Sequence, residues 1–191
     1  MAPRFKILLN IPNAITLFRL AVIPTIIILF FIPSVIARWA IVVFYTAACI
    51  SDFFDGYLAR KLNQYSDFGK LFDPIADKIL VATALILLVA IDRLQGLTLI
   101  PTLIILSREI LVSGLREFLA TYQLSIPVTY LAKWKTTAQM FAIGFLLGSH
   151  AIPEWDWTLW VGLILLWVAA ILTLVTGYHY FKQGLWHVLK G

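Results

Sequence analysis

Charged residues are scarce in this sequence, where they make up 13% of 191 residues. In a typical soluble domain roughly a quarter of the residues are charged and about half are apolar. Here 61% of the residues are hydrophobic, and the mean hydropathy is +0.91. This composition excludes an ordinary soluble globular domain and indicates a membrane protein.

Cysteine is almost absent as well, since Cys49 is the single one. It can form no disulfide within the chain, and its apolar neighbours predict a buried small hydrophobe. The first residues, MAPRFKILLNIPN, lack a small-residue cleavage site after a short apolar core, so we expect no removable signal peptide. No Arg/Ser-rich transit segment precedes the first apolar run, which favours a bacterial inner membrane over an organelle.

Long apolar runs are what the sequence does contain. One membrane-spanning helix takes about 20 residues, so we predict an all-α, polytopic membrane bundle of six transmembrane helices in a single domain, residues 1–191. The expected helices cover residues 14–34, 37–58, 72–91, 96–118, 134–152 and 157–179. Ahead of them, apolar and polar side chains alternate over residues 4–10, which fits either a short interfacial helix or a disordered tail.

The basic residues predict the orientation of these helices. With the N-terminus in the cytoplasm, the outer connections carry Arg38 and Arg93 alone. The inner segments carry Arg4, Lys6, Arg60, Lys61, Lys70, Lys133, Lys135, Lys182 and Lys190. Because Lys and Arg accumulate in cytoplasmic loops, we expect both termini in the cytoplasm. The same loops explain the net charge of +5 without a nucleic-acid partner.

The few acidic residues are gathered in one place. Five of the seven aspartates fall between positions 52 and 77. Asp52 and Asp55 share a helix face at i,i+3, and Asp73 and Asp77 share one at i,i+4. A short turn between the two helices would bring four carboxylates together at the cytoplasmic surface.

Four carboxylates this close repel one another unless they are protonated or held by cations. Carboxylate oxygens are the hard ligands that Mg²⁺, Mn²⁺ and Ca²⁺ prefer. Four of them suit a site in which two metal ions clamp a phosphoryl group during displacement. The fifth residue, Asp67, is expected to be a solvated loop charge or an N-cap.

Small residues and one arginine accompany the aspartates. Gly56 follows Asp55 directly, and Gly69 lies four residues before Asp73. Both lack a Cβ, and Ala59 is small, so a ligand could approach closely. Close packing of membrane helices is the alternative explanation for the glycines. Arg60 offers a fork of donors suited to a phosphate.

The whole pattern resembles, at every fixed position, the signature of the CDP-alcohol phosphotransferases: Asp52-x2-Asp55-Gly56-x2-Ala59-Arg60-x8-Gly69-x3-Asp73-x3-Asp77. The resemblance implies a six-helix membrane enzyme that moves a phosphatidyl or similar group from a CDP-linked donor to an alcohol and releases CMP. It implies that the four aspartates hold two divalent metal ions, Mg²⁺ or Mn²⁺, and that Asp77 is the general base. It also implies that Asp52, Gly56, Ala59 and Gly69 border the nucleotide and that Arg60 contacts the diphosphate.

The start of the first predicted helix carries a polar face. Asn13, Thr16 and Arg19 are spaced at i, i+3 and i+6 within PNAITLFR. Asn13 and Thr16 are candidate contacts of the CDP-linked donor. The alternative is that Asn13 caps the helix and Arg19 snorkels to the interface.

Charges also lie deep in the fourth predicted helix. Arg108 and Glu109 would sit on the order of 13 Å from its cytoplasmic end at 1.5 Å per residue, where a charge needs a partner. Glu109 and Arg116, at i,i+7, could form a structural pair. Arg108 would then be left for an anionic substrate. At the start of the fifth helix, Lys135 is either an interfacial anchor or a second phosphate ligand.

Longer stretches also resemble bacterial members of the family that use CDP-diacylglycerol as donor and sn-glycerol 3-phosphate as acceptor. They are NIPNAITLFRL, SDFFDGYLARKLNQ, GKLFDPIADKIL, SREILVSGLREF and KTTAQM. The resemblance implies that Arg108, Arg116 and Lys135 bind the acceptor phosphate and that the enzyme is a homodimer among membrane lipids. Other members would instead take phosphatidylglycerol, serine or inositol phosphate. A cation transporter is a distant alternative, because it would place its carboxylates nearer the membrane midplane.

Overall fold

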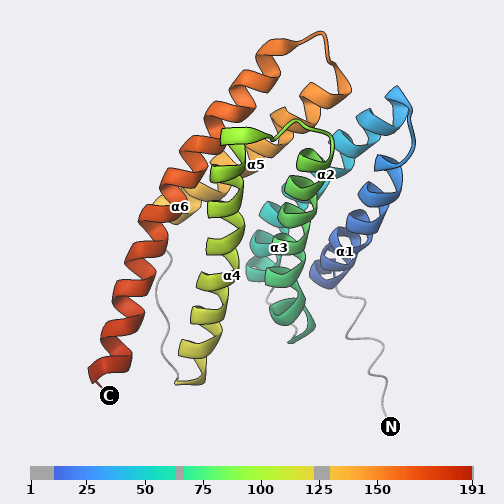
Figure 1. Cartoon of the computed structure of the whole chain (residues 1–191). Helices are drawn as coiled ribbons and strands as arrows, with labels where there is room; N and C mark the ends of the chain where they lie inside the picture. Colours follow the sequence, from blue (N-terminus) through green and yellow to red (C-terminus); the bar gives the residue numbers. More distant parts are fainter. Residues whose placement is uncertain (1–10, 63–66, 123–129, 191) are drawn as a thin grey trace. The chain divides into compact units, whose positions relative to one another are not determined.

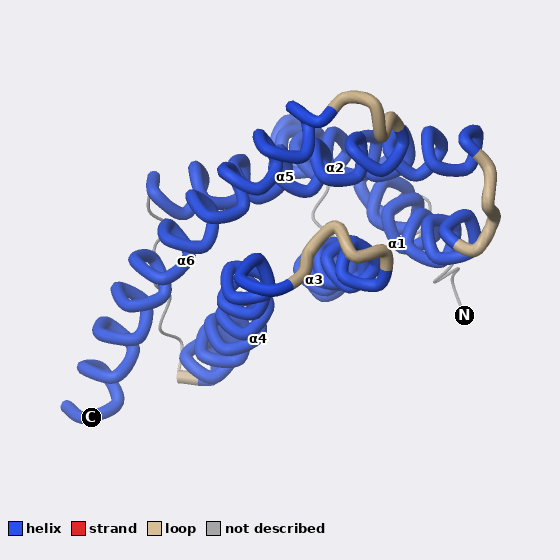
Figure 2. The backbone as a smooth tube through the Cα atoms, turned by 45° about the horizontal axis from the view of Figure 1, so that its top comes forward, coloured by secondary structure: helices blue, strands red, loops and turns tan. Residues whose placement is uncertain are grey.

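The computed structural model describes residues 11–62, 67–122 and 130–190 (Figure 1). The predicted alternatives for residues 4–10, an interfacial helix or a tail, lie outside the described residues. The helices are α1 (Ile11–Phe30), α2 (Val35–Leu62), α3 (Asp67–Ala90), η2 (Gly96–Thr98), α4 (Leu99–Thr121), α5 (Tyr130–Ala151) and α6 (Asp156–Lys190). All described secondary structure is helical (Figure 2), so the predicted all-α class is confirmed. Five of the predicted spans begin and end within five residues of one α-helix, while the sixth, predicted for residues 157–179, belongs to a helix that continues to Lys190.

Four helices are long and apolar enough to cross a membrane by length and composition, and they are α1, α2, α4 and α6. The helices α3 and α5 have 24 and 22 residues, respectively, which is a sufficient length. Their composition differs because α3 carries Asp73, Asp77 and Lys78 and α5 carries Lys133 and Lys135. The chain is a multi-pass membrane protein, and its two more polar helices are those to which the sequence assigns part of a site.

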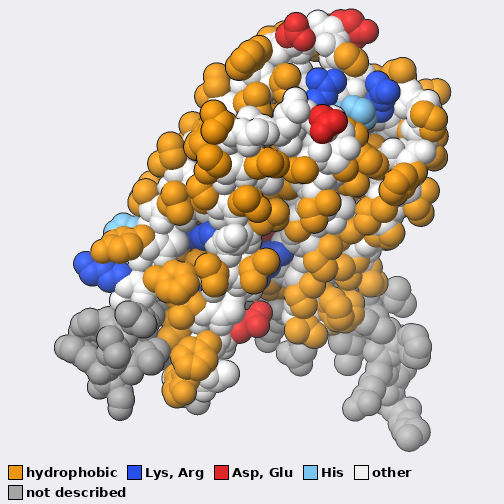
Figure 3. Space-filling view, in the orientation of Figure 1, with side chains coloured by type: hydrophobic (Ala, Val, Ile, Leu, Met, Phe, Trp, Pro, Cys, Tyr) orange, Lys and Arg blue, Asp and Glu red, His pale blue; other side chains and the backbone are white. Residues whose placement is uncertain are grey.

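The exterior is apolar, as contact with lipid requires. Hydrophobic side chains cover most of the face seen in Figure 3. Ile36 is 82% exposed and Ile110 is 72% exposed. Large contiguous apolar surfaces of this kind are rare on soluble monomers and mark interaction with a membrane or a partner.

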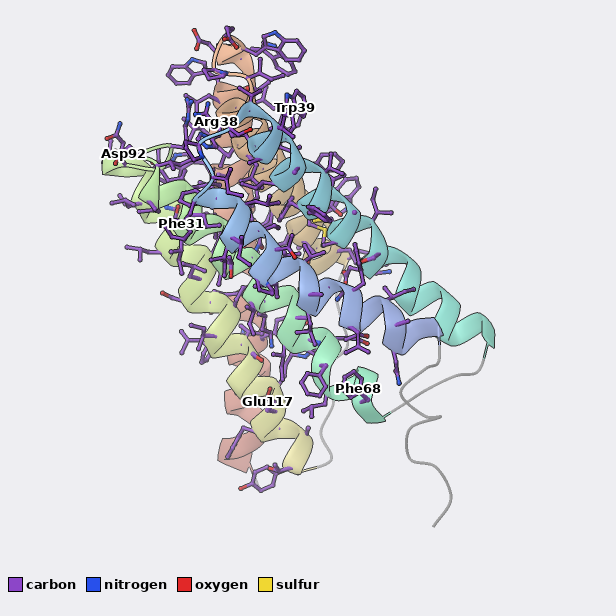
Figure 4. All side chains as sticks on the ribbon, turned by 90° about the vertical axis from the view of Figure 1, so that its right-hand side faces the viewer. Phe31, Arg38, Trp39, Phe68, Asp92 and Glu117 are labelled. Carbon is purple, nitrogen blue, oxygen red and sulfur yellow. The ribbon has the colours of Figure 1, made fainter. Side chains whose placement is uncertain are left out.

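The chain forms two compact units, which are described separately. The first unit comprises residues 1–88 and 147–154, and the second comprises residues 89–146 and 155–191. The prediction of a single domain therefore stays a prediction. In the first unit α1 packs against α2. Figure 4 shows Phe31, Arg38 and Trp39 near the connection between α1 and α2, with Phe68 at the opposite end of this unit.

Apolar side chains from three helices fill the first unit. Those of α1, α2 and α3 that are at most 3% exposed are Val22, Ile26, Ile41, Tyr45, Ala48, Ala76, Leu80, Ala84, Leu85 and Leu88. The small alanines allow close approach of the helices, as is typical of membrane bundles. This packing fixes the rotation of α1, and so decides which of its side chains point toward α2 and α3.

In the second unit α4 packs against α6, and α6 also approaches α5. A Cβ built on Gly162 of α6 would lie 2.8 Å from Cγ of Leu146, so the helices meet at a glycine. The chain enters this unit through a tight turn in which Asp92 has a φ of 58° and Gly96 a φ of 57°. Aspartate, asparagine and glycine tolerate this left-handed conformation better than most residues.

Candidate active site

The predicted metal-binding aspartates lie on α2 and α3 of the first unit. Asp52 belongs to α2, while Asp73 and Asp77 belong to α3, and all three are partly buried. Asp55 also lies within α2, but its side chain is outside the described part, as are those of Ala59 and Arg60 and the surroundings of Gly56. Gly69 is buried near the start of α3.

The polar face of α1 contacts two of these aspartates. Thr16 Oγ1 donates a hydrogen bond to Asp73 Oδ1 at 2.5 Å. One turn further along α1, Arg19 Nη1 lies 2.8 Å from Asp52 Oδ1. One helix face therefore holds carboxylates from two other helices. The charge of Asp73 also acts on the Asp52 carboxyl group, which places these two acidic groups within electrostatic range.

Arg19 is enclosed by the protein, with a side-chain exposure of 0%, whereas the Asp52 side chain is 32% exposed. The alternative that Arg19 snorkels to the membrane interface is therefore wrong. A buried guanidinium is retained only where an anion and hydrogen-bond acceptors compensate its lost hydration. Asp52 supplies that anion, and Arg19 in turn balances part of the negative charge of the aspartate cluster.

Asp77 of α3 lies within electrostatic range of Cys49, which is one turn before Asp52 on α2. Its charge acts on both Tyr45 and Cys49 of α2. Cys49 is only half-buried, so the expectation of a buried small hydrophobe is only partly correct. Two polar side chains of α2, those of Tyr45 and Cys49, therefore lie on the two turns that precede Asp52.

The chemistry of the described donor set fits divalent cations. Carboxylate oxygens are the ligands that Mg²⁺ and Mn²⁺ prefer, and an ionised carboxylate has about four lone-pair sites, so one bond to Thr16 or Arg19 leaves others open. Among the described side chains, which exclude Asp55, no three metal-ligating residues form a group. The described part of the chain therefore does not bring Asp52, Asp73 and Asp77 together as a set of metal ligands, and the four-aspartate site stays a prediction.

The donor candidates on α1 are both inaccessible to solvent. Asn13 is 0% exposed and Thr16 is 1% exposed. The hydroxyl of Thr16 donates a hydrogen bond to Asp73, which makes it a partner of one of the predicted metal-binding carboxylates. Asn13 lies one turn before it on the same face of α1.

The predicted acceptor ligands lie in the second unit. Lys135 of α5 donates a hydrogen bond to Glu109 of α4 and is 5% exposed. Arg108 Nη1 lies 3.6 Å from the same Glu109 oxygen. The alternative pair between Glu109 and Arg116 is wrong, because Glu109 faces Lys135 instead. Arg116 is exposed on α4, so the structure brings two of the three predicted cations to one carboxylate.

Sequence reasoning missed the contribution of α6. Arg108 Nη2 donates a hydrogen bond to Thr176 Oγ1 at 3.1 Å, and Arg108 Cζ lies 5.8 Å from the centre of the Tyr180 ring. The pattern T-x2-TG-x2-Y at residues 173–180 could have signalled a polar stripe in an otherwise apolar helix. It also missed Arg19 as the partner of Asp52, although Arg19 shares a helix face with Thr16.

Comparison with known proteins bears on the whole chain. The family model described as CDP-alcohol phosphatidyltransferase matches residues 9–175. A Rickettsia typhi protein named CDP-diacylglycerol–glycerol-3-phosphate 3-phosphatidyltransferase is 51% identical over 91% of this chain and 96% of its own length. A Shigella flexneri protein of the same name is 40% identical over 92% of this chain and 94% of its own length. A Cereibacter sphaeroides protein of that name is 36% identical over 92% of this chain and 96% of its own length.

Proposed function

The chain belongs to the CDP-alcohol phosphatidyltransferase family, and from this premise we propose that it transfers the phosphatidyl group of CDP-diacylglycerol to sn-glycerol 3-phosphate. The products are phosphatidylglycerophosphate and CMP, so the enzyme serves phospholipid biosynthesis. The observation that carries the proposal is the 51% identity to a relative of that name along 91% of the chain. The unbroken aspartate pattern supports the reaction class.

We propose that Asp52, Asp55, Asp73 and Asp77 hold two divalent metal ions, Mg²⁺ or Mn²⁺. Members of the family generally use divalent metals. When bound, the ions supply positive charge that neutralises the transferring phosphoryl group. The contacts of Thr16 and Arg19 support the proposal, because partners that orient a ligating carboxylate are a usual part of metal sites.

In the proposed reaction, Asp77 accepts the proton from the 1-hydroxyl of glycerol 3-phosphate. That oxygen forms a bond to the phosphorus bearing diacylglycerol, while the bond from this phosphorus to the bridging oxygen of the diphosphate breaks. CMP leaves with the electron pair of that bond. A general base needs hydrogen-bond reach to the proton it removes, so the acceptor hydroxyl must lie beside Asp77 during transfer.

The other candidate site residues divide between the two substrates. We assign Gly56, Ala59, Gly69 and Arg60 to the CDP part of the donor, together with Asn13, Thr16 and Asp52. Arg108, Arg116 and Lys135 are assigned to the acceptor phosphate. The contact of both Arg108 and Lys135 with Glu109 supports this grouping, since two cations near one carboxylate leave positive charge for a phosphate.

We propose a bacterial inner membrane as the location, with both termini and the active site on the cytoplasmic side. The donor is a membrane lipid, so its acyl chains would stay among apolar helix faces while its diphosphate reaches the aspartates. A homodimer is the proposed assembly. The basic segments flanking the predicted helices support this orientation.

The reaction can be tested with purified protein in detergent. CDP-diacylglycerol and Mg²⁺ or Mn²⁺ are supplied with glycerol 3-phosphate, phosphatidylglycerol, serine or inositol phosphate in turn, and CMP release is measured. Glycerol 3-phosphate is expected to give product, and EDTA is expected to stop it. Product with another alcohol and none with glycerol 3-phosphate would overturn the assignment of the acceptor.

The metal proposal has its own test in Asp73→Asn. Loss of a residue that hydrogen-bonds to a metal ligand lowers metal affinity or activity by about 10- to 100-fold. Loss of the charge of the ligand itself is therefore expected to lower turnover by at least about 100-fold. The control is Asp92→Asn, whose residue lies in the tight turn of the second unit and tolerates asparagine at its φ of 58°. Wild-type turnover in folded Asp73→Asn protein would rule out a metal ligand at this position.

A further inference from the structure

The Arg108 side chain lies against α6, where Thr176, Gly177 and Tyr180 contact it. We infer that these three residues are positioning residues that hold the Arg108 guanidinium for the phosphate of the acceptor. The inference rests on the proposed function, in which Arg108 binds that phosphate. Tyr180 lies at i+4 from Thr176 and at i+3 from Gly177, so it is a neighbour of each of them on the surface of α6.

The hydroxyl of Thr176 is oriented to receive Arg108. Its hydrogen is directed at the backbone of its own helix, with Leu172 O at 2.8 Å and Thr173 O at 3.2 Å. A hydroxyl has one hydrogen and two lone pairs, so its oxygen is left to accept the bond from Arg108 Nη2. Thr176 is 2% exposed, and water does not replace this acceptor easily.

Gly177 allows the stem of Arg108 to lie against the α6 backbone. A Cβ at this position would be 3.2 Å from Arg108 Cγ and 3.7 Å from Nε. That separation to Cγ is shorter than an ordinary van der Waals contact of about 3.5–4.0 Å between carbons. An alanine would push the base of the arginine side chain away, and because the far end is bound to Thr176, the guanidinium would tilt.

Tyr180 borders the guanidinium from the next turn of α6. Its ring is 4% exposed, and the ring centre lies 5.8 Å from Arg108 Cζ, within the range of a cation–π contact. The ring is planar and rigid, so it restricts the orientations that the plane of the guanidinium can take. Together with Thr176 it leaves Arg108 with little rotational freedom.

The guanidinium is held, but its hydrogen bonds are incomplete. Arg108 Nε is buried and has no hydrogen-bond partner among the described residues. The contact of Nη1 with Glu109, at 3.6 Å, is an ion pair longer than a hydrogen bond. A buried donor without an acceptor is costly in a purely structural role. A phosphate oxygen would satisfy it, and a planar guanidinium binds phosphate through two parallel donors.

The experiment compares Thr176→Val, Gly177→Ala and Tyr180→Leu in the CMP-release assay with full-length protein in detergent. Each variant is expected to raise KM for glycerol 3-phosphate, by about tenfold for Thr176→Val, since a hydrogen bond to a charged group is involved. KM for CDP-diacylglycerol and kcat at saturating acceptor are expected to stay within about twofold. Tyr180→Phe keeps the ring and is expected to retain the wild-type KM.

Matched controls are available in the same unit. Thr137→Val removes an exposed hydroxyl that also donates to the carbonyl four residues earlier, Lys133 O at 3.1 Å. Gly144→Ala adds a Cβ to a helix where no atom lies within 4 Å. Neither control is expected to change acceptor KM. Equal rises in KM for glycerol 3-phosphate and KM for CDP-diacylglycerol, or a fall in kcat alone, would overturn the positioning role. Size-exclusion profiles confirm that each variant is folded.

A double-variant comparison separates this inference from the proposed function. Arg108→Ala should raise acceptor KM by itself, and Thr176→Val should add nothing further on that background, because coupled residues are not additive. If Arg108→Ala leaves acceptor KM unchanged, the proposed role of Arg108 fails. If Arg108→Ala raises acceptor KM while Thr176→Val and Gly177→Ala do not, the inference that α6 positions Arg108 is wrong, and the proposed role of Arg108 stands.

Discussion

At the scale of single residues, the candidate site depends on pairs of polar side chains contributed by different helices. Arg19 and Thr16 each contact one aspartate, and both are almost inaccessible to solvent. Buried polar groups are stabilising only when their partners are present. Removal of either α1 residue should therefore affect the carboxylate it contacts before it affects any substrate.

Arg19→Met is expected to lower the stability of the protein. The substitution leaves Asp52 without its guanidinium partner, and breaking a buried pair costs about 3–5 kcal/mol. Because Asp52 is 32% exposed, the loss is expected near or below the lower end of that range, at about 2–3 kcal/mol. Thermal unfolding in detergent measures it, with Arg38→Met as the control at the other end of α2. Equal unfolding temperatures for the two variants would show that the ion pair contributes little.

Thr16→Val is expected to lower turnover by about 10- to 100-fold, as does loss of other outer partners of metal ligands. The variant has nearly the same shape but cannot donate to Asp73 Oδ1. Thr16→Ser keeps the donor and should retain most of the activity. Steady-state CMP release compares the two variants. A serine variant as slow as the valine variant would argue for packing of the methyl group and against the hydrogen bond.

At the scale of elements, a charged contact between helices orders the second unit. Glu109 of α4 accepts a hydrogen bond from Lys135 of α5, and Lys135 is 5% exposed. Few charged groups are found at such depth without a partner. The contact therefore ties α4 to α5, while Arg108 ties α4 to α6.

Glu109→Gln is expected to destabilise the protein by about 2–4 kcal/mol, because it leaves Lys135 buried without a counter-charge. The double variant Glu109→Gln with Lys135→Met should recover most of this loss, since neither charge remains. Thermal unfolding of the single and double variants measures the coupling. Glu117→Gln, at an exposed position on the same helix, is the control. If the stability lost in the double variant equals the sum of the losses in Glu109→Gln and Lys135→Met, the two residues are not paired.

At the scale of the whole molecule, orientation in the membrane decides which substrates reach the site. The bias of Lys and Arg predicts that both termini lie in the cytoplasm and that the connection between α5 and α6 lies outside. Glycerol 3-phosphate and CMP are charged and do not cross a membrane freely. The predicted orientation therefore puts the aspartates on the side where these compounds are made and used.

Cysteine labelling tests this orientation. In a Cys49→Ala background, which has no other cysteine, a cysteine replaces either Glu154 or Lys133. An impermeant maleimide added to intact spheroplasts is expected to label Glu154→Cys at once and Lys133→Cys only after permeabilisation. The reverse pattern would show that the active site faces outward. Retained CMP release confirms that the variants are correctly inserted.

The sequence by itself determined the membrane class, the six helices and the position of most aspartates between residues 52 and 77. These follow from composition, from apolar runs of membrane-spanning length and from helical spacing, all of which act over neighbouring residues. The family pattern then indicated the reaction, and comparison along the chain agreed with it.

The tertiary structure alone decided the partners of the buried charges. Glu109 and Arg116 share one helix at i,i+7, yet Glu109 pairs with Lys135, which lies 26 residues away. Arg19 pairs with Asp52, and Arg108 binds Thr176, 68 residues further along the chain. Spacing fixes only which side chains share a face of one helix. Helix packing fixes which faces meet, and a buried charge pairs with the opposite charge or acceptor that this packing brings within reach.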